Sequence, residues 1–90
     1  MTFEWDALKD KRNTEKHGVP FEEALLSFHD ADRIIYSDAR HSTVNESRFF
    51  CIGKVRERIM TVRFTYKDGH VRIIGAGYWR KGRSLYENRT

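Results

Sequence analysis

The spacing of apolar residues changes near residue 33, and this change limits the folds open to the chain. The first part contains one helical stripe at i, i+3, i+4 and i+7, formed by Phe21, Ala24, Leu25 and Phe28. In residues 58–66 apolar and polar residues instead alternate, as they do in a half-buried strand. The sequence therefore predicts helices followed by a run of strands, which is the order of an α+β fold.

The expected elements can be placed from their end signals. Asp6 is a suitable N-cap for a helix that reaches about His17, and Gly18 supplies the left-handed residue that ends it. Pro20 suits the start of the second helix. The remaining expectations are strands at 3–5, 33–36, 48–53, 58–66 and 71–76, a polar loop at 37–47, turns at 54–57 and 67–69, and a helix at 82–88. We expect a short N-terminal strand, two helices, a four-strand antiparallel meander and a short C-terminal helix, with the helices on one face of the sheet.

Length and composition narrow the class of protein. Ninety residues with 39% apolar content and one proline predict a single domain spanning 1–90 rather than a disordered chain. No segment has the pattern of a membrane span or a signal peptide, and one cysteine, Cys51, favours a reducing cytoplasm. Cys51 stands in an apolar run, so we expect it to be buried. The four histidines show no metal-ligand spacing, and we predict no metal and no cofactor: His17, His29, His41 and His70.

The charge surplus lies at the C-terminal end. Residues 1–69 contain twelve Lys or Arg and twelve Asp or Glu, so residues 70–90 carry the whole net charge of +4. Cations alternate there with aromatic residues, in the order Tyr78, Trp79, Arg80, Lys81, Arg83, Tyr86 and Arg89. This composition suits a polyanion with exposed bases. The alternative is a solvated terminal helix with two core aromatics.

Strand alternation extends this basic region backwards. If the apolar face of the sheet packs on the helices, Arg63 and Arg72 project from the open face. Two guanidinium groups on one face repel each other unless an anion lies between them. The alternative is that carboxylates such as Glu46 or Glu57 pair with them, as exposed charges commonly do.

Beyond these patterns, the chain resembles a known family over nearly its whole length. The N-terminal part of the resemblance consists of Phe3-x-Trp5-Asp6, Lys9, Asn13, Lys16-His17-Gly18-Val19, Phe21-Glu22-Glu23-Ala24 and Phe28. The rest consists of Asp38-x-Arg40-His41, Glu46-x-Arg48, Gly53, Arg72-Ile73-Ile74 and Tyr86-Glu87. These motifs are similar to those of the BrnT family, the small toxins of bacterial type II toxin–antitoxin systems.

The resemblance implies a RelE-like fold and metal-free ribonuclease activity. It also implies a BrnA-like ribbon-helix-helix antitoxin, which holds the toxin inactive and contacts operator DNA, so that the toxin meets DNA only indirectly. A dimer within the antitoxin complex is compatible with such systems. Family members commonly end the last strand with Ile-Ser-Ala-Arg, whereas Gly75 and Gly77 replace the usual Ser and Arg here. Arg80 or Arg83 then has to supply the missing cation, or activity is weak or absent.

Metal-free cleavage requires the ribose 2′-OH to attack the adjacent phosphate, and this sets the roles to be filled. Arg63 and Arg72 suit the phosphoryl charge, with Arg80 and Arg83 as further cations. The candidates for proton transfer are Tyr78, Tyr86, Lys81 and His41, and the tyrosines and the lysine would need a depressed pKa. Trp79 or Tyr78 can stack a base, and Glu46 and Arg48 are secondary candidates for substrate binding. His17 is interpreted as a helix terminator.

Three functional hypotheses follow from the residues and the resemblance. The first is an RNA-cleaving toxin that uses the residues named above. The second is a non-catalytic relative that binds the antitoxin as a corepressor, which the glycines at 75 and 77 favour. The third is a basic module that binds nucleic acid directly, and it ranks last because no helix has the pattern of a DNA recognition helix.

Overall fold

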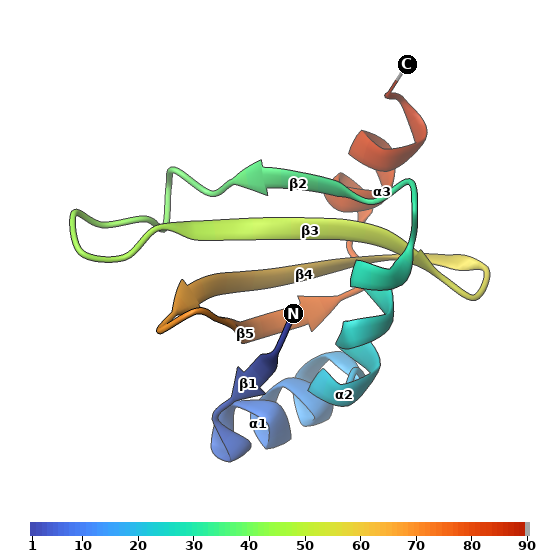
Figure 1. Cartoon of the computed structure of the whole chain (residues 1–90). Coiled ribbons are helices and arrows are strands. Elements are labelled where there is room, and N and C mark those ends of the chain that lie inside the picture. The colour runs from blue at the N-terminus through green and yellow to red at the C-terminus, as the bar shows by residue number, and fades with distance from the viewer. Residues whose placement is uncertain (90) are drawn as a thin grey trace.

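The structure, a computed structural model, describes residues 1–89 and contains one mixed five-stranded sheet (Figure 1). The strands are β1 (Phe3–Trp5), β2 (Ile34–Ser37), β3 (Arg48–Val55), β4 (Arg58–Lys67) and β5 (His70–Gly77), in the spatial order β1-β5-β4-β3-β2. The helices are α1 (Ala7–His17), α2 (Phe21–Ala24), the 3₁₀ helix η1 (Leu25–His29) that continues it, and α3 (Arg80–Glu87). Within residues 1–89 every helix is too short or too polar to span a membrane.

The predicted α+β order is confirmed, and the meander from β2 to β5 is antiparallel throughout. The pairing of the N-terminal strand was not predicted. β1 lies parallel to β5, with Phe3 opposite Val71 and Trp5 opposite Ile73. Figure 1 shows the result: β1 and β2 form the two edges of the sheet, and α1 lies beside β1. A three-residue strand thereby brings the first helix to the edge of the last strand.

Local signals set the ends of α1 as predicted. The Asp6 side chain accepts hydrogen bonds from the backbone N–H groups of Leu8 and Lys9, at 2.8 and 3.0 Å. Both bonds lower the pKa of the Asp6 carboxyl, and the bond from Lys9 has the larger effect. Gly18 ends the helix with φ 71°, a left-handed conformation that glycine adopts without steric cost.

One face of the sheet, here called the core face, packs against α2 and η1. Phe21 and Phe64 are fully buried there, and the ring of Phe28 lies 5.2 Å from that of Phe64. Removing either buried ring would cost about 3–5 kcal/mol of stability. Cys51 is also fully buried on this face, as predicted. Gly53 allows the close approach of η1, because an added Cβ would collide with the backbone of Ser27.

The opposite face, here called the second face, is covered in part by α3, and the prediction that all helices share one face is wrong for this helix. Gly82 of α3 lies directly on Thr61 and Ile52, which face each other across β4 and β3. The residues before and after them in these strands point to the core face. Ile52 is 1% exposed and Ile59 is 9% exposed, so this part of the second face is largely apolar, with Thr61 as its buried polar residue. It needs a cover, and the C-terminal helix provides one.

A bulge between β4 and β5 alters the predicted alternation. Arg63 lies opposite Gly75, but the next residue, Phe64, lies opposite Ile73, so Ile74 is the extra residue of β5. The bulge lets both Ile73 and Ala76 reach the core. Gly75 and Gly77, which alternate with Ala76, therefore lie on the second face, and Gly75 is beside Arg63.

Candidate functional site

One amide side chain links α1 to β5. Asn13 Nδ2 donates hydrogen bonds to the carbonyl oxygens of Val19 and Ala76, at 2.8 and 2.9 Å. The backbone N–H of Ala76 donates to Asn13 Oδ1 at 3.2 Å. Since β1 pairs only as far as Ile73, the Asn13 amide takes the place of a strand partner further along β5. This contact fixes the position of α1 at the edge of the second face.

The side of α1 that carries Asn13 is strongly basic. The helical spacing i, i+3, i+4, i+7 and i+8 places five residues on this side: Lys9, Arg12, Asn13, Lys16 and His17. All five line a pocket of about 300 Å³ between the helix and the second face. Its other lining residues are Arg63, Ile74, Gly75 and Trp79. We call this hollow the α1 pocket.

Within residues 1–89, cations and no carboxylate line the α1 pocket. Lys9, Arg12, Lys16 and Arg63 contribute four positive charges. Arg63 is partly buried and forms no ion pair within the described residues. Like charges gathered at this density repel one another, and an anion in the pocket would relieve that repulsion. The geometry is thus that of an anion-binding site.

Trp79 forms one wall of the pocket and rests on the backbone of β5. An added Cβ on Gly77 would come within 2.6 Å of Cε2 and Cζ2 of the indole, so the ring lies directly over this glycine. The indole also meets the His17 ring edge-on, with 5.1 Å between ring centroids and an interplanar angle of 90°. Gly75 has more space, because its added Cβ would meet only Asn13 Oδ1 at 3.7 Å and Arg63 Cδ at 3.9 Å.

Two other arginines of the sheet that were predicted for the site, Arg72 and Arg48, are paired with carboxylates. Arg72 donates to Glu4, its neighbour on β1, at 2.6 Å, and Arg48 donates to Glu46 at 2.7 Å. Carboxylate pairing was the stated alternative for the sheet arginines, and it holds for Arg72, although its partner is Glu4 rather than Glu46 or Glu57. Of the three sheet arginines predicted for the site, Arg63 is the one without a carboxylate partner within the described residues.

The two tyrosines predicted to transfer protons are held by acceptors elsewhere. Tyr78 donates to Glu23 at 3.2 Å under the guanidinium of Arg58, and burial and the Glu23 carboxylate raise its pKa. Tyr86 donates to Asp30 at 2.5 Å, and this bond, together with burial, raises its pKa. The depressed pKa that a tyrosine base requires is therefore absent at both positions.

The start of α3 contains the remaining predicted cations. Arg80 and Lys81 are exposed and form no ion pair within residues 1–89. Arg83 lies 3.9 Å from Glu87, and both side chains are more than half exposed. Neither Arg80 nor Arg83 lines the α1 pocket. Within residues 1–89, no group of three or more His, Cys, Asp or Glu side chains could hold a metal ion.

Residues 5–82 match the family described as ribonuclease toxin, BrnT, of type II toxin–antitoxin systems. The chain belongs to the BrnT family. It is therefore related to ribonuclease toxins, whose class implies RNA as the substrate and an antitoxin as the partner. No curated protein matches the sequence. The family match covers the α1 pocket completely and ends at Gly82, so Arg83 and Tyr86 lie beyond it.

The structure separates the BrnT-family motifs by role. The Asp38-x-Arg40-His41 motif closes the loop between β2 and β3: His41 Nδ1 bonds to the buried Asp38 at 2.9 Å. Ser42 Oγ accepts from the Arg48 backbone at 2.9 Å and donates to the Asp38 carbonyl at 2.7 Å. His41 thus stabilises a loop and does not line the α1 pocket.

By contrast, the BrnT-family motif Lys9, Asn13 and Lys16-His17 belongs to the pocket. The functional prediction from the residues alone passed over Lys9, Arg12 and Lys16, and it interpreted His17 as a helix terminator. His17 is the last residue of α1, and it also lines the pocket. The helical spacing of these cations was the signal that could have identified them.

Proposed function

We propose that this BrnT-family protein is a metal-independent endoribonuclease and that RNA binds in the α1 pocket. The observation that carries the proposal is the cluster of cations around Arg63, which contains no carboxylate among the described residues. The other arginines of the second face, Arg48 and Arg72, are each paired with a glutamate. RNA is the polyanion that the family implies. Guanidinium and ammonium groups can bind its phosphate without a metal.

The residues of the pocket fit the needs of the cleavage step. Attack by the 2′-OH on the adjacent phosphorus forms a cyclic phosphate and releases the 5′-oxygen of the next nucleotide. The phosphoryl oxygens gain negative charge on the way, and Arg63, with Arg12 and Lys16 opposite, is placed to stabilise it. His17 is the one pocket residue of the type that commonly moves protons near neutral pH, and we assign it that role.

The cellular role follows from the family at a coarser level. We propose that messenger RNA in the cytoplasm is the substrate, so that cleavage inhibits translation. We also propose that a BrnA-like ribbon-helix-helix antitoxin neutralises the protein and links it to operator DNA. A neighbouring gene for a small ribbon-helix-helix protein would support this proposal, and a neighbour of another class would contradict it.

A second candidate function is a non-catalytic relative that only binds the antitoxin. One observation favours it: the indole of Trp79 occupies the space above Gly77, where family members commonly have an arginine. If that arginine is essential for cleavage, a chain with Gly77 beneath Trp79 is inactive. Growth arrest on expression without antitoxin separates the two, because the non-catalytic candidate predicts normal growth.

RNA digestion by the purified protein in EDTA tests the main proposal. We expect cleavage that leaves cyclic phosphate ends, and a fall of about a hundredfold or more in kcat/KM for Arg63→Ala. Arg12→Ala should reduce RNA binding and the dependence of binding on salt. The matched control is Lys11→Ala, which removes a charge from the same helix but outside the pocket. Circular dichroism confirms that each variant is folded. Equal activity of Arg63→Ala and Lys11→Ala would reject this site.

A further inference from the structure

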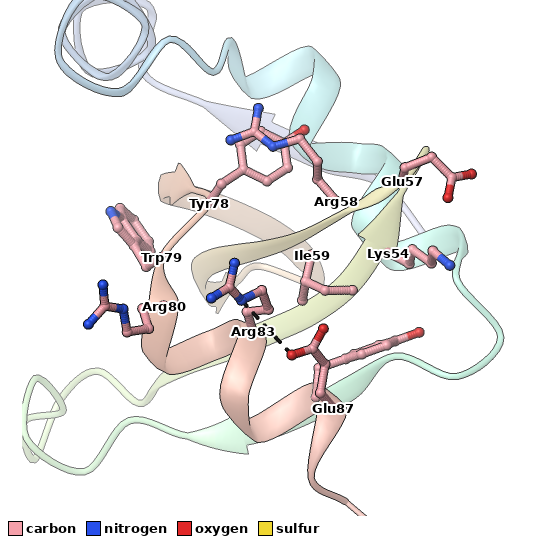
Figure 2. Close-up of a pocket in the computed structure, with 10 residues that line it drawn as sticks. Lys54, Glu57, Arg58, Ile59, Tyr78, Trp79, Arg80, Arg83 and Glu87 are labelled. Carbon is pink, nitrogen blue, oxygen red and sulfur yellow. Dashed lines mark ion pairs between the residues drawn. The ribbon is translucent and has the colours of Figure 1, made fainter.

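A second hollow shares Trp79 with the α1 pocket, and the proposed cleavage step does not use it. It has a volume of about 490 Å³ and runs between α3 and the turn that joins β3 to β4 (Figure 2). We call it the Trp79 groove. Its lining residues are Lys54, Glu57, Arg58, Ile59, Tyr78, Trp79, Arg80, Arg83, Tyr86 and Glu87.

The charge of the Trp79 groove is positive but less extreme than that of the α1 pocket. Among the residues that the structure describes, four cations and two carboxylates line it. Glu87 lies 3.9 Å from Arg83, and both side chains are about 60% exposed (61% and 59%). An exposed pair at that distance contributes little, so Arg83 remains available to another anion. Figure 2 shows Arg80 and Arg83 on the same helix, with Trp79 just before it.

Trp79 connects the two hollows, because it lines both of them. Gly77 supports the indole from below, and the His17 ring meets it from the side of the α1 pocket. The side chain is held in place while remaining partly exposed. A rigid aromatic ring between two groups of cations is the arrangement with which proteins bind single-stranded nucleic acid.

We propose that the Trp79 groove is a second nucleotide subsite for single-stranded RNA. A base next to the reactive phosphate stacks on Trp79, and the following phosphate lies against Arg80 and Arg83. This inference rests on the proposed function, since it assumes that the reactive phosphate occupies the α1 pocket. An acidic peptide would also suit the charges, but the partly exposed indole of Trp79, which lines the α1 pocket as well, favours RNA.

Oligonucleotides of two lengths test the subsite. The probes are 2′-O-methylated oligouridylates, which cannot be cleaved because the attacking hydroxyl is blocked. A dinucleotide has one phosphate and two bases, so it can occupy the α1 pocket and stack on Trp79. A pentanucleotide can in addition place a phosphate against Arg83. The background variant Trp5→Phe leaves Trp79 as the single tryptophan, so fluorescence reports on its stacking.

We expect both oligonucleotides to quench the fluorescence of Trp79 and the pentanucleotide to bind more tightly than the dinucleotide. Arg83→Ala should remove most of that difference and lower the log–log salt slope for the pentanucleotide by about 0.7, the value for one phosphate contact on a single strand. The matched control is Arg40→Ala, an exposed loop arginine that lines neither hollow and should leave the slope unchanged.

Two results would overturn the subsite. One is an equal slope for Arg83→Ala and Arg40→Ala. The other is unchanged RNA binding by Arg83→Ala together with weaker binding of the antitoxin, which would assign the groove to the protein partner. Failure of the proposed function has a different signature, because Arg63→Ala would then leave the affinity for the dinucleotide unchanged.

Discussion

Trp79 occupies the space that a side chain on Gly77 would need. An added Cβ at residue 77 would lie 2.6 Å from two atoms of the indole, which is closer than carbon atoms approach without displacement. A side chain at residue 77 and the indole of Trp79 in this position therefore compete for the same space. Gly77 and Trp79 form a matched pair, and a substitution at one has to be judged together with the other.

Because Gly77 and Trp79 are in contact, we expect substitutions at the two positions to have non-additive effects on the free energy of unfolding. Gly77→Ala should destabilise the protein by about 1–3 kcal/mol, because the new methyl group displaces the indole. In a Trp79→Ala background the same change should cost much less, which gives a coupling of about 1 kcal/mol or more. Denaturant unfolding of the two single variants and the double variant measures this. Additive effects would show that the ring moves aside freely.

Gly75 behaves differently, and Gly75→Ser is predicted to be tolerated. Its Cβ would make only ordinary contacts with Asn13 and Arg63, at 3.7 and 3.9 Å. Replacing a strand glycine should leave stability unchanged or raise it by up to about 1 kcal/mol. The new hydroxyl would enter the α1 pocket, and we expect faster RNA cleavage than in Gly75→Ala, which adds the methylene group alone. Equal rates for the two variants would show that the hydroxyl has no role.

Asn13→Ala should show how much RNA cleavage depends on the position of α1 rather than on its charge. The change removes no cation, yet it leaves the N–H and C=O groups of Ala76 without their partners. We expect a loss of about 2–3 kcal/mol in the free energy of unfolding. RNA cleavage should fall as well, because Lys9 and Arg12 are no longer held opposite Arg63. Wild-type cleavage by folded Asn13→Ala would show that α1 needs no such anchor.

Because the Cys51 thiol is buried, we expect the protein to lose stability at alkaline pH. Burial raises its pKa from 9.0 to about 11. A group whose pKa is higher in the folded state stabilises the protein below its unfolded pKa, and the contribution is lost as the pH rises through the folded value. Between pH 9 and 11 the thiol should therefore account for about 2 kcal/mol of lost stability. Denaturant unfolding across this range checks it, and Cys51→Ala should show a shallower decline. Identical pH profiles would contradict the assignment.

Signals within a few residues were enough to predict much of the fold. Asp6 and Gly18 set the ends of α1, and the strand alternation of β4 identified Phe64 as core and Arg63 as a residue of the opposite face. These predictions succeeded because each depends on the backbone geometry of its own segment. The bulge at Ile74 was missed, since it exists only in the pairing of β4 with β5.

The candidate site was predicted only in part, for a related reason. The sequence indicated Arg63 and Trp79, and both line the α1 pocket. It gave equal standing to Arg72, which is paired with Glu4, and to Tyr78, whose hydroxyl is bound to Glu23. Which arginine lacks a carboxylate depends on contacts between segments far apart in the chain.

The sequence by itself determined the succession of helices and strands, the two faces of the central strand and the basic character of the protein. Those properties follow from local periodicity and composition. Tertiary structure decided where the cations gather, because the parallel pairing of β1 with β5 and the Asn13 anchor bring the cations of α1 to Arg63. Electrostatic repulsion and attraction depend on distance in space, and only the folded chain sets those distances.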